Sequence, residues 1–329
     1  MGDAGLGERD LIRLILQRLS VMPDLPVPFG DDVAAVPLIG GEVAVLKTDM
    51  LVGATDVPSG MSLFAAARKA VVMNISDFAS KGVLPTAILV ALGLPKNLAN
   101  NKSILEIADG LNSGAREYGC YVVGGDTAET TDLIISISLF GTIKEGSIMQ
   151  RKGTRAGDIL AVTGLFGKTA AGLHLLKKGG KANQQVTKML LDAVYNPKAH
   201  LKEGLALRGY DCVSGSMDSS DGLAWSINEL AQVNGVGFFL DRIPVAVEAG
   251  EYAAENGLDA LDLALYGGEE YELVLTIKPE KWQEAKRVVE TVGGNLIPIG
   301  KATYEQKITY EVAGEEKTVK PEGYEHFKS

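Results

Sequence analysis

Hydrophobic and polar residues repeat along the chain with periods that alternate between those of helices and strands. In the first half, the pattern predicts helices over 10–19, 62–82 and 103–119, and strands over 42–51, 85–95, 120–127 and 132–143. Ser62 is a predicted N-cap of the second helix, and Gly82 ends it. The first helix is charged and amphipathic, so we expect it to dock on the rest of the protein.

The polar stretch 144–158 has turn signals and few large apolar residues, which predicts a domain boundary near 147, with domains 1–146 and 147–329. Beyond it, strands are predicted over 159–167, 237–244, 271–279 and 295–302, helices over 168–179, 219–235 and 279–294, and a hairpin with a tail over the last thirty residues. Strands alternate with helices in both halves. The fold class is therefore predicted as α/β or α+β.

Composition narrows the classes of function. The 329 residues carry a formal net charge of -10, which argues against a nucleic-acid-binding face. No signal peptide is recognised, and no apolar run is long enough for a transmembrane span. The two cysteines, Cys120 and Cys212, lack the spacing of a zinc site and fit a reducing, cytoplasmic location. An acidic protein that handles phosphates needs metal ions to supply positive charge.

Aspartates recur beside small residues near the ends of predicted elements. They are Asp31 and Asp32 in "PFGDD", Asp49, Asp77, Asp126, Asp218 and Asp221. Any one of them could be a solvated turn or cap, but Asp77 lies inside an apolar helix, where a carboxylate is costly unless it is paired or metal-bound. Hard oxygen ligands favour Mg²⁺, and several ions that share many aspartates suggest a polyphosphate ligand.

Two other kinds of site are excluded. "TGLFGKTAAG" (163–172) resembles a phosphate-binding P-loop, but the motif needs glycine where the chain has Val162, so Lys168 is interpreted as a helix-start lysine. The histidines at 174, 200 and 326 have no convincing Ser or Cys partner for a nucleophilic triad.

Eight motifs together resemble a known family. "FGDD", "KTDMLV", "RKAVVMNISDFASKG", "GGDT", "RKGTRAGDILAVTG", "DSSDGL", "GGEEYEL" and "GYEHF" occur in the order seen in thiamine-monophosphate kinases, of the aminoimidazole ribonucleotide synthetase superfamily. The resemblance implies a two-domain fold whose N-terminal domains pair into a β-barrel in a homodimer, with ATP bound between the domains. It also implies Mg²⁺-assisted transfer of the γ-phosphoryl group of ATP directly onto thiamine monophosphate. No nucleic acid or membrane partner is implied.

The resemblance also assigns roles residue by residue. It implies magnesium ligands at Asp32, Thr48, Asp49, Asp77, Asp126, Asp218 and Asp221, ATP contacts at Tyr118, Gly125, Asp126, Arg151 and Ser220, and thiamine-phosphate contacts at Glu269 and Tyr324. Catalytic roles are expected for Asp77, Asp126, Arg151 and Asp221. Asp77 would bridge several ions, and Arg151 would stabilise transition-state charge. The alternatives are a solvent-exposed linker arginine for Arg151 and a surface aromatic for Tyr324.

Three positions depart from the family pattern. Lys47 stands where many members have Ser or Thr, and a lysine side chain is no metal ligand. Asp56 replaces a substrate-contacting histidine and could pair with a cationic part of thiamine or cap a turn. Glu270 replaces an aspartate. The alternative functions are another ATP-dependent reaction of the superfamily, or nucleotide and metal binding without catalysis.

Overall fold

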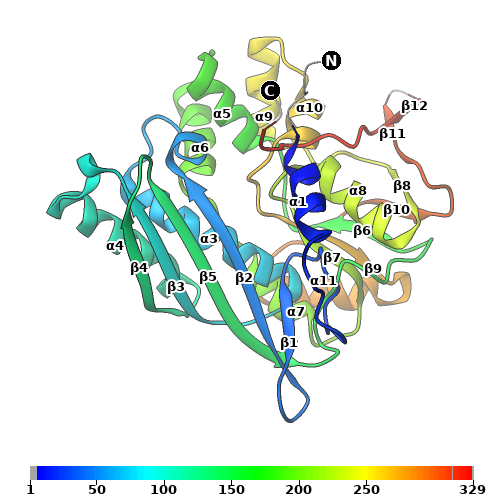
Figure 1. Cartoon of the computed structure of the whole chain (residues 1–329). Coiled ribbons are helices and arrows are strands. Elements are labelled where there is room, and N and C mark those ends of the chain that lie inside the picture. The colour runs from blue at the N-terminus through cyan, green and yellow to red at the C-terminus, as the bar shows by residue number, and fades with distance from the viewer. Residues whose placement is uncertain (1–5, 313, 328–329) are drawn as a thin grey trace, which may run out of the picture.

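The computed structural model describes residues 6–312 and 314–327, which form two mixed sheets and their covering helices (Figure 1). The first sheet has the order β1 (Ala34–Pro37), β2 (Glu42–Val52), β5 (Ile134–Lys144), β3 (Pro85–Leu94) and β4 (Tyr121–Glu129). Its pairs are antiparallel except β3 with β4. Helix α4 (Asn101–Glu117) packs against α3 (Leu63–Lys81), and α3 lies against β2 and β5.

The other face of this sheet is open in the single chain. Leu46 is paired with Phe140 in the β2–β5 register, and their side chains are 42% and 37% exposed. Met50 on β2 and Leu89 on β3 are 54% and 51% exposed. An apolar sheet face of this kind indicates a partner surface.

Helix α3 is the central helix of the molecule. The Ser62 side chain accepts a hydrogen bond from the Ala65 amide, and Gly82 ends the helix at φ 65°, as the sequence predicts. Besides the first sheet, α3 contacts strand β7 (Val213–Asp218) and helix α7 (Leu201–Leu207) of the second half. Because it is covered from both sides, its polar side chains are forced into the interior.

The second sheet is built from the second half of the chain. Its order is β12 (Glu315–Thr318), β11 (Ile308–Val312), β8 (Gly237–Leu240), β10 (Ile297–Thr303), β6 (Ile159–Val162), β9 (Leu273–Ile277) and β7. The further helices are α1 (Glu8–Leu16), α2 (Gly53–Asp56), α5 (Lys168–Lys178), α6 (Gln184–Tyr195), α8 (Leu223–Asn234), α9 (Val247–Asn256), α10 (Ala260–Tyr266) and α11 (Trp282–Thr291), with 3₁₀ turns at Lys96–Leu98 and Pro279–Lys281.

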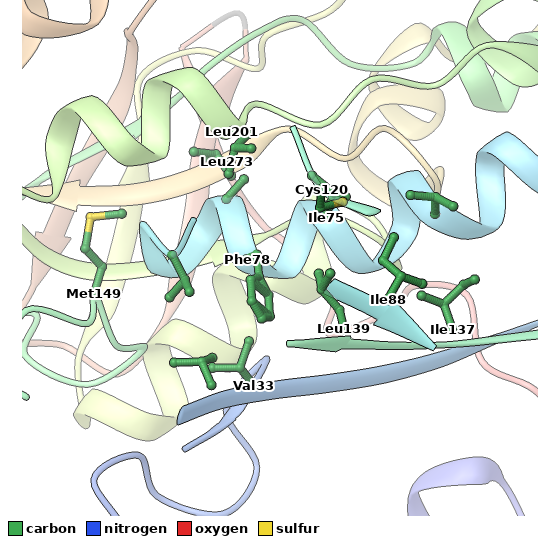
Figure 2. Close-up of a cluster of buried hydrophobic side chains, with 14 of the residues drawn as sticks. Val33, Ile75, Phe78, Ile88, Cys120, Ile137, Leu139, Met149, Leu201 and Leu273 are labelled. Carbon is green, nitrogen blue, oxygen red and sulfur yellow. The ribbon is translucent and has the colours of Figure 1, made fainter. Parts of the chain in front are cut away.

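The two halves share one apolar core. Figure 2 shows Ile75 and Phe78 of α3 in the same cluster as Ile137 of the first sheet and Leu201 and Leu273 of the second half. Burial of such side chains is the main force that holds the halves together. The polar groups on α3 and β7 therefore lie in a rigidly packed interface between the two sheets.

The predicted mixed fold class is confirmed, and the terminal hairpin is formed by β11 and β12. One local prediction is wrong: the helix predicted from 219 begins at Leu223. Helix α1 contacts the second half through Arg9, which pairs with Glu325 at 3.1 Å and stacks on Trp225, although none of its residues is fully buried. The chain passes from the first sheet to the second between Lys144, the end of β5, and Ile159, the start of β6. The domain boundary at 147 stays a prediction. In the described part of the chain, no helix is long and apolar enough to cross a membrane.

Candidate active site

Three buried aspartates from distant parts of the sequence lie close together at the interface between the sheets. Asp32 follows the turn at Gly30, Asp77 lies on α3, and Asp218 ends β7. Each offers a carboxylate oxygen, and these oxygens lie within 4.8 Å of one another. All three residues are buried, at 6% exposure or less. Like charges this close repel one another unless protons or cations separate them.

Protein cations and hydroxyls partly compensate the cluster. Asp32 accepts hydrogen bonds from Arg151 Nε at 2.9 Å and from the Ser80 hydroxyl at 2.9 Å, and Lys81 Nζ lies 2.8 Å from it. Burial raises the pKa of Asp32, but Arg151 and Lys81 outweigh that effect and hold the pKa below its usual range. Asp32 is therefore ionised.

The other two aspartates are less well compensated. Asp218 accepts a hydrogen bond from the Ser76 hydroxyl at 2.6 Å, but burial and the neighbouring Asp32 raise its pKa to about 7. Burial raises the pKa of Asp77 well above the usual value, although Lys47 acts in the opposite direction. Both carboxylates would be stabilised in their ionised form by a further cation.

Lys47 extends from β2 into this cluster. Its Nζ lies 3.1 Å from Asp77 and 3.4 Å from Asp49. Burial lowers the pKa of Lys47, but the charges of Asp77 and Asp49 outweigh it and raise the pKa. Side chains alternate between the faces of a strand, so Lys47 and Asp49 face α3 while Thr48 points the other way. The Thr48 hydroxyl donates to the Ile137 carbonyl at 2.9 Å and is not brought to the cluster.

Arg151 is tied into the site. Its guanidinium contacts Asp32 and lies 3.1 Å from Glu229, and its side chain is 16% exposed, so the alternative of a solvent-exposed linker arginine is wrong. Its backbone amide donates to Asp31 at 3.0 Å. Asp31 also lies 2.6 Å from Lys81 Nζ and its side chain is 5% exposed, so it is not a solvated turn residue.

A pocket of about 520 Å³ is lined by four of the residues that are predicted to contact ATP or thiamine monophosphate. Asp56, Ser220, Glu269 and Tyr324 line it. Asp56 accepts a hydrogen bond from the Val52 amide at 2.7 Å, so it both caps a turn and faces the pocket. Ser220 is two residues from Asp218, so their Cα atoms lie no more than about 7 Å apart.

The Glu269 side chain is held in this pocket by Lys69, whose Nζ contacts its carboxylate and donates to the Asp56 carbonyl at 3.0 Å. The Glu269 backbone has φ 64°, a region that residues other than glycine rarely adopt, and its amide donates to the Ser220 carbonyl at 2.6 Å. The Lys69 side chain is 1% exposed. This ion pair, in which the lysine is buried and the glutamate is partly exposed, joins α3 to the loop that carries Glu269.

The remaining candidates lie outside the buried cluster. Asp126 is exposed on edge strand β4, beside Gly125, where a Cβ would come within 1.9 Å of the Val90 carbonyl oxygen. The Tyr118 hydroxyl accepts a hydrogen bond from the Ala199 amide at 2.9 Å. Asp221 lies in the loop before α8, where burial raises its pKa to about 6.

The sequence predictions did not include Lys69, Lys81, Ser76 or Ser80 as site residues. A signal for the two lysines was present, because both lie in the same apolar helix that singled out Asp77, and a buried ammonium group needs a partner as much as a carboxylate does. No pattern in the sequence marks the two serines.

The donor set of the cluster fits Mg²⁺. The groups that converge are carboxylates and serine hydroxyls, which are hard oxygen ligands. Both cysteines are buried and free, and neither is among the converging groups. Asp32, Asp77 and Asp218 are the residues that would hold such an ion.

Comparison with known proteins gives the family. Residues 30–143 match the N-terminal domain of AIR synthase related proteins, and residues 155–313 match their C-terminal domain. The thiamine-monophosphate kinase of Nitrosopumilus maritimus is 34% identical over 284 residues, which cover 86% of this chain and 89% of that protein. The chain belongs to the thiamine-monophosphate kinase family. The corresponding kinase of Pyrococcus horikoshii is 36% identical over 276 residues, 83% of each chain.

Solved structures agree with this family. A structure described as AaThiL complexed with AMPPCP and TMP superposes with a TM-score of 0.84 at 29% identity, over 98% of this chain and 97% of that one. The Aquifex aeolicus thiamine monophosphate kinase superposes with a TM-score of 0.79 at 27% identity, over 96% and 99%. Escherichia coli HypE, at 20% identity and a TM-score of 0.71, shares the fold. The resemblance predicted from the eight motifs is confirmed.

Proposed function

We propose that this protein transfers the γ-phosphoryl group of ATP directly onto the phosphate of thiamine monophosphate, and so produces thiamine diphosphate and ADP. The observation that carries the proposal is the buried cluster of Asp32, Asp77 and Asp218, together with a pocket of about 520 Å³ whose lining includes Ser220, two residues from Asp218. Family membership supports it, since relatives that align over most of the chain are thiamine-monophosphate kinases.

The chemistry needs charge compensation more than it needs a base. An oxygen of the acceptor phosphate attacks the γ-phosphorus, and the bond from that phosphorus to the β–γ bridging oxygen breaks, with its electron pair left on ADP. The acceptor is already an anion, so positioning and charge neutralisation carry the catalysis. This is consistent with a site that is rich in aspartates and lacks a nucleophilic triad.

Mg²⁺ bound by Asp32, Asp77 and Asp218, with Asp49, Asp126 and Asp221 as further proposed ligands, would neutralise phosphate charge. Thr48 is not among them, because its hydroxyl donates to the Ile137 carbonyl on the other face of β2. Arg151 is held in place by Asp32 and Glu229. We propose that it binds the γ-phosphoryl group during transfer, on the side of the site formed by the turn at Gly30. Ser220, Tyr118 and Gly125 are the other proposed ATP contacts. Asp56, Glu269 and Tyr324 are proposed to hold thiamine monophosphate in the pocket.

We also propose a homodimer formed through the open face of the first sheet. That face exposes Leu46, Met50, Leu89 and Phe140, and edge strand β4 exposes Tyr121, Val122 and Val123. Pairing with a second copy would bury this apolar surface and cover the sheet edge. Sedimentation of the protein at micromolar concentration tests this, and a monomer would overturn it.

The proposed reaction is tested by mixing the purified protein with ATP, magnesium and thiamine monophosphate and separating the products. Thiamine diphosphate formed in step with ADP is the expected result. ATP cleavage only with a precursor of aminoimidazole ribonucleotide would favour the other enzymes of the superfamily. Binding of ATP without any product would favour the non-catalytic alternative.

A further inference from the structure

The position of the Lys47 ammonium group is the feature of the site that the proposed reaction does not explain. It lies 3.1 Å from Asp77 and 3.4 Å from Asp49, and the Lys47 side chain is 18% exposed. Burying an ammonium group is costly unless it is paired, and here it is paired with a carboxylate that belongs to the proposed metal cluster. Lys47 therefore competes directly with a metal ion for an oxygen of Asp77.

The cations of the site are divided between its two sides. Arg151 and Lys81 contact Asp32, on the side of the turn. Lys47 contacts Asp77 and Asp49, on the side of β2. Among the residues that the structure describes, Asp218 is in no ion pair and has the Ser76 hydroxyl as its partner. The cluster thus has protein cations on two sides, at Asp32 and at Asp77. The carboxylate of Asp218 has no cationic partner among the described residues.

A lysine and a magnesium ion satisfy carboxylates in different ways. An ammonium group is a single positive charge whose hydrogen bonds to carboxylate oxygens are about 2.7–2.9 Å long. Mg²⁺ carries two charges and requires its oxygens at about 2.0–2.1 Å in an octahedral arrangement. The two cannot occupy the same space between Asp49 and Asp77.

We infer that the Lys47 ammonium group is a permanent cation of the active site that takes the place of one divalent ion between Asp49 and Asp77. The nucleotide-free protein accordingly binds one divalent ion fewer than the same aspartates bind without the lysine. The inference rests on the proposed binding of Mg²⁺ by this cluster. It adds a built-in charge that does not depend on the metal concentration.

The test counts ions rather than turnover. Mn²⁺, which can be followed by electron paramagnetic resonance, is titrated into nucleotide-free wild-type protein and into Lys47→Met. We expect the variant to bind one more Mn²⁺ per protomer than the wild type. Lys47→Arg retains the charge and is expected to bind the wild-type number. Lys47→Thr is a second neutral variant, with the same expected gain, if Lys47→Met does not fold.

Two further variants separate the local charge from total charge. Lys286→Met removes an exposed lysine whose partner, Glu290, is 3.8 Å away on α11, and it is expected to leave the number of bound ions unchanged. Lys47→Met combined with Asp49→Asn removes one charge of each sign from the β2 side and is expected to return the number to that of the wild type.

Equal numbers of Mn²⁺ in wild type, Lys47→Met and Lys47→Thr would overturn the inference, as would a gain that also appears in Lys47→Arg. The failure of the proposed function is seen separately, in the wild type. A wild-type protein that makes thiamine diphosphate while the variants bind no extra ion contradicts the role of Lys47 alone. A wild type that transfers no phosphate to thiamine monophosphate contradicts the proposed function, whatever the ion count.

Discussion

The Ser76 hydroxyl on α3 donates a hydrogen bond of 2.6 Å to the carboxylate of Asp218 at the end of β7, and both side chains are buried. The two residues lie 142 positions apart in the sequence and come from different halves of the chain. Since Asp77 follows Ser76 directly, the same helical turn that carries one aspartate of the cluster also orients another. The geometry of the cluster therefore depends on the packing of α3 against β7.

Ser76→Ala removes this donor and leaves one oxygen of Asp218 without its partner. We expect the free energy of unfolding to fall by about 1–3 kcal/mol, because a buried acceptor loses its hydrogen bond to a hydroxyl.

Asp218→Asn is expected to lower kcat by about a hundredfold or more, because a ligand charge is lost at the point where phosphate charge must be stabilised.

Denaturant unfolding and steady-state kinetics measure the two effects. Asp109→Asn changes an exposed carboxylate on α4 and provides the matched control, with both quantities expected to stay close to the wild type. If Asp218→Asn turned over as fast as Asp109→Asn, Asp218 would have no part in the reaction.

Lys81 is a buried link between the halves. Its Nζ donates to the Ser216 carbonyl at 2.6 Å and lies 2.6 Å from Asp31 and 2.8 Å from Asp32. Lys81→Met leaves two buried carboxylates with fewer partners, and we expect a loss of about 3–5 kcal/mol in the free energy of unfolding. Urea denaturation checks this, with Lys286→Met, from an exposed ion pair, expected to change stability by about 0.5 kcal/mol or less. Equal stability of the two variants would contradict the linking role.

Much of the fold could be predicted because its strongest local signals agree with its packing. Helix α3 has a serine N-cap, a long apolar run and a terminal glycine, and it was predicted almost to the residue. Strand β1 was missed since four residues are too few to show a period. Helix α6 was also missed, although Asn183 caps it and Val186, Leu190 and Val194 recur at helical spacing.

The site was only partly predictable. The aspartates stand out in the sequence since carboxylates are unexpected beside apolar strands and inside an apolar helix. Which of them meet depends on long-range packing: Asp32, Asp77 and Asp218 converge, whereas Asp126 lies exposed on β4. The opposite orientations of Thr48 and Asp49 follow from the alternation of a strand and could have been predicted.

His200 should make stability depend on pH. Its Nε2 lies 2.8 Å from Glu272 and its Nδ1 lies 3.3 Å from Glu203. Burial lowers the pKa of His200, but Glu272 and Glu203 outweigh it and raise the pKa to about 10. A raised pKa means that the folded state keeps a proton that the unfolded state releases above its ordinary value of 6.5.

The stabilisation by protonated His200 is therefore complete below about pH 6.5 and declines as the pH rises toward 10. At pH 6, we expect His200→Gln to be less stable than the wild type by about 2 kcal/mol, the contribution of charge-assisted hydrogen bonds. Urea denaturation at pH 6, 8 and 10 should show this difference shrinking. A difference that grew with pH would show that the histidine is neutral in the folded protein.

Tyr324 lines the pocket of about 520 Å³, and its ring stands edge-on to His326 with the ring centres 5.0 Å apart. We expect Tyr324→Ala to raise the KM for thiamine monophosphate about tenfold, the loss of one aromatic contact, while the KM for ATP stays the same. Tyr304, which is 92% exposed, provides the control as Tyr304→Ala. Equal changes in both KM values would place Tyr324 outside the thiamine pocket.

The central claim is direct transfer between two phosphates at the aspartate cluster. The most direct measurement supplies ATP labelled in its γ-phosphate, magnesium, thiamine monophosphate and an excess of unlabelled inorganic phosphate, and locates the label in the products. The claim predicts label in the terminal phosphate of thiamine diphosphate, undiluted by the free phosphate and absent when magnesium is withheld. Label found only in inorganic phosphate, with thiamine monophosphate unchanged, would contradict it.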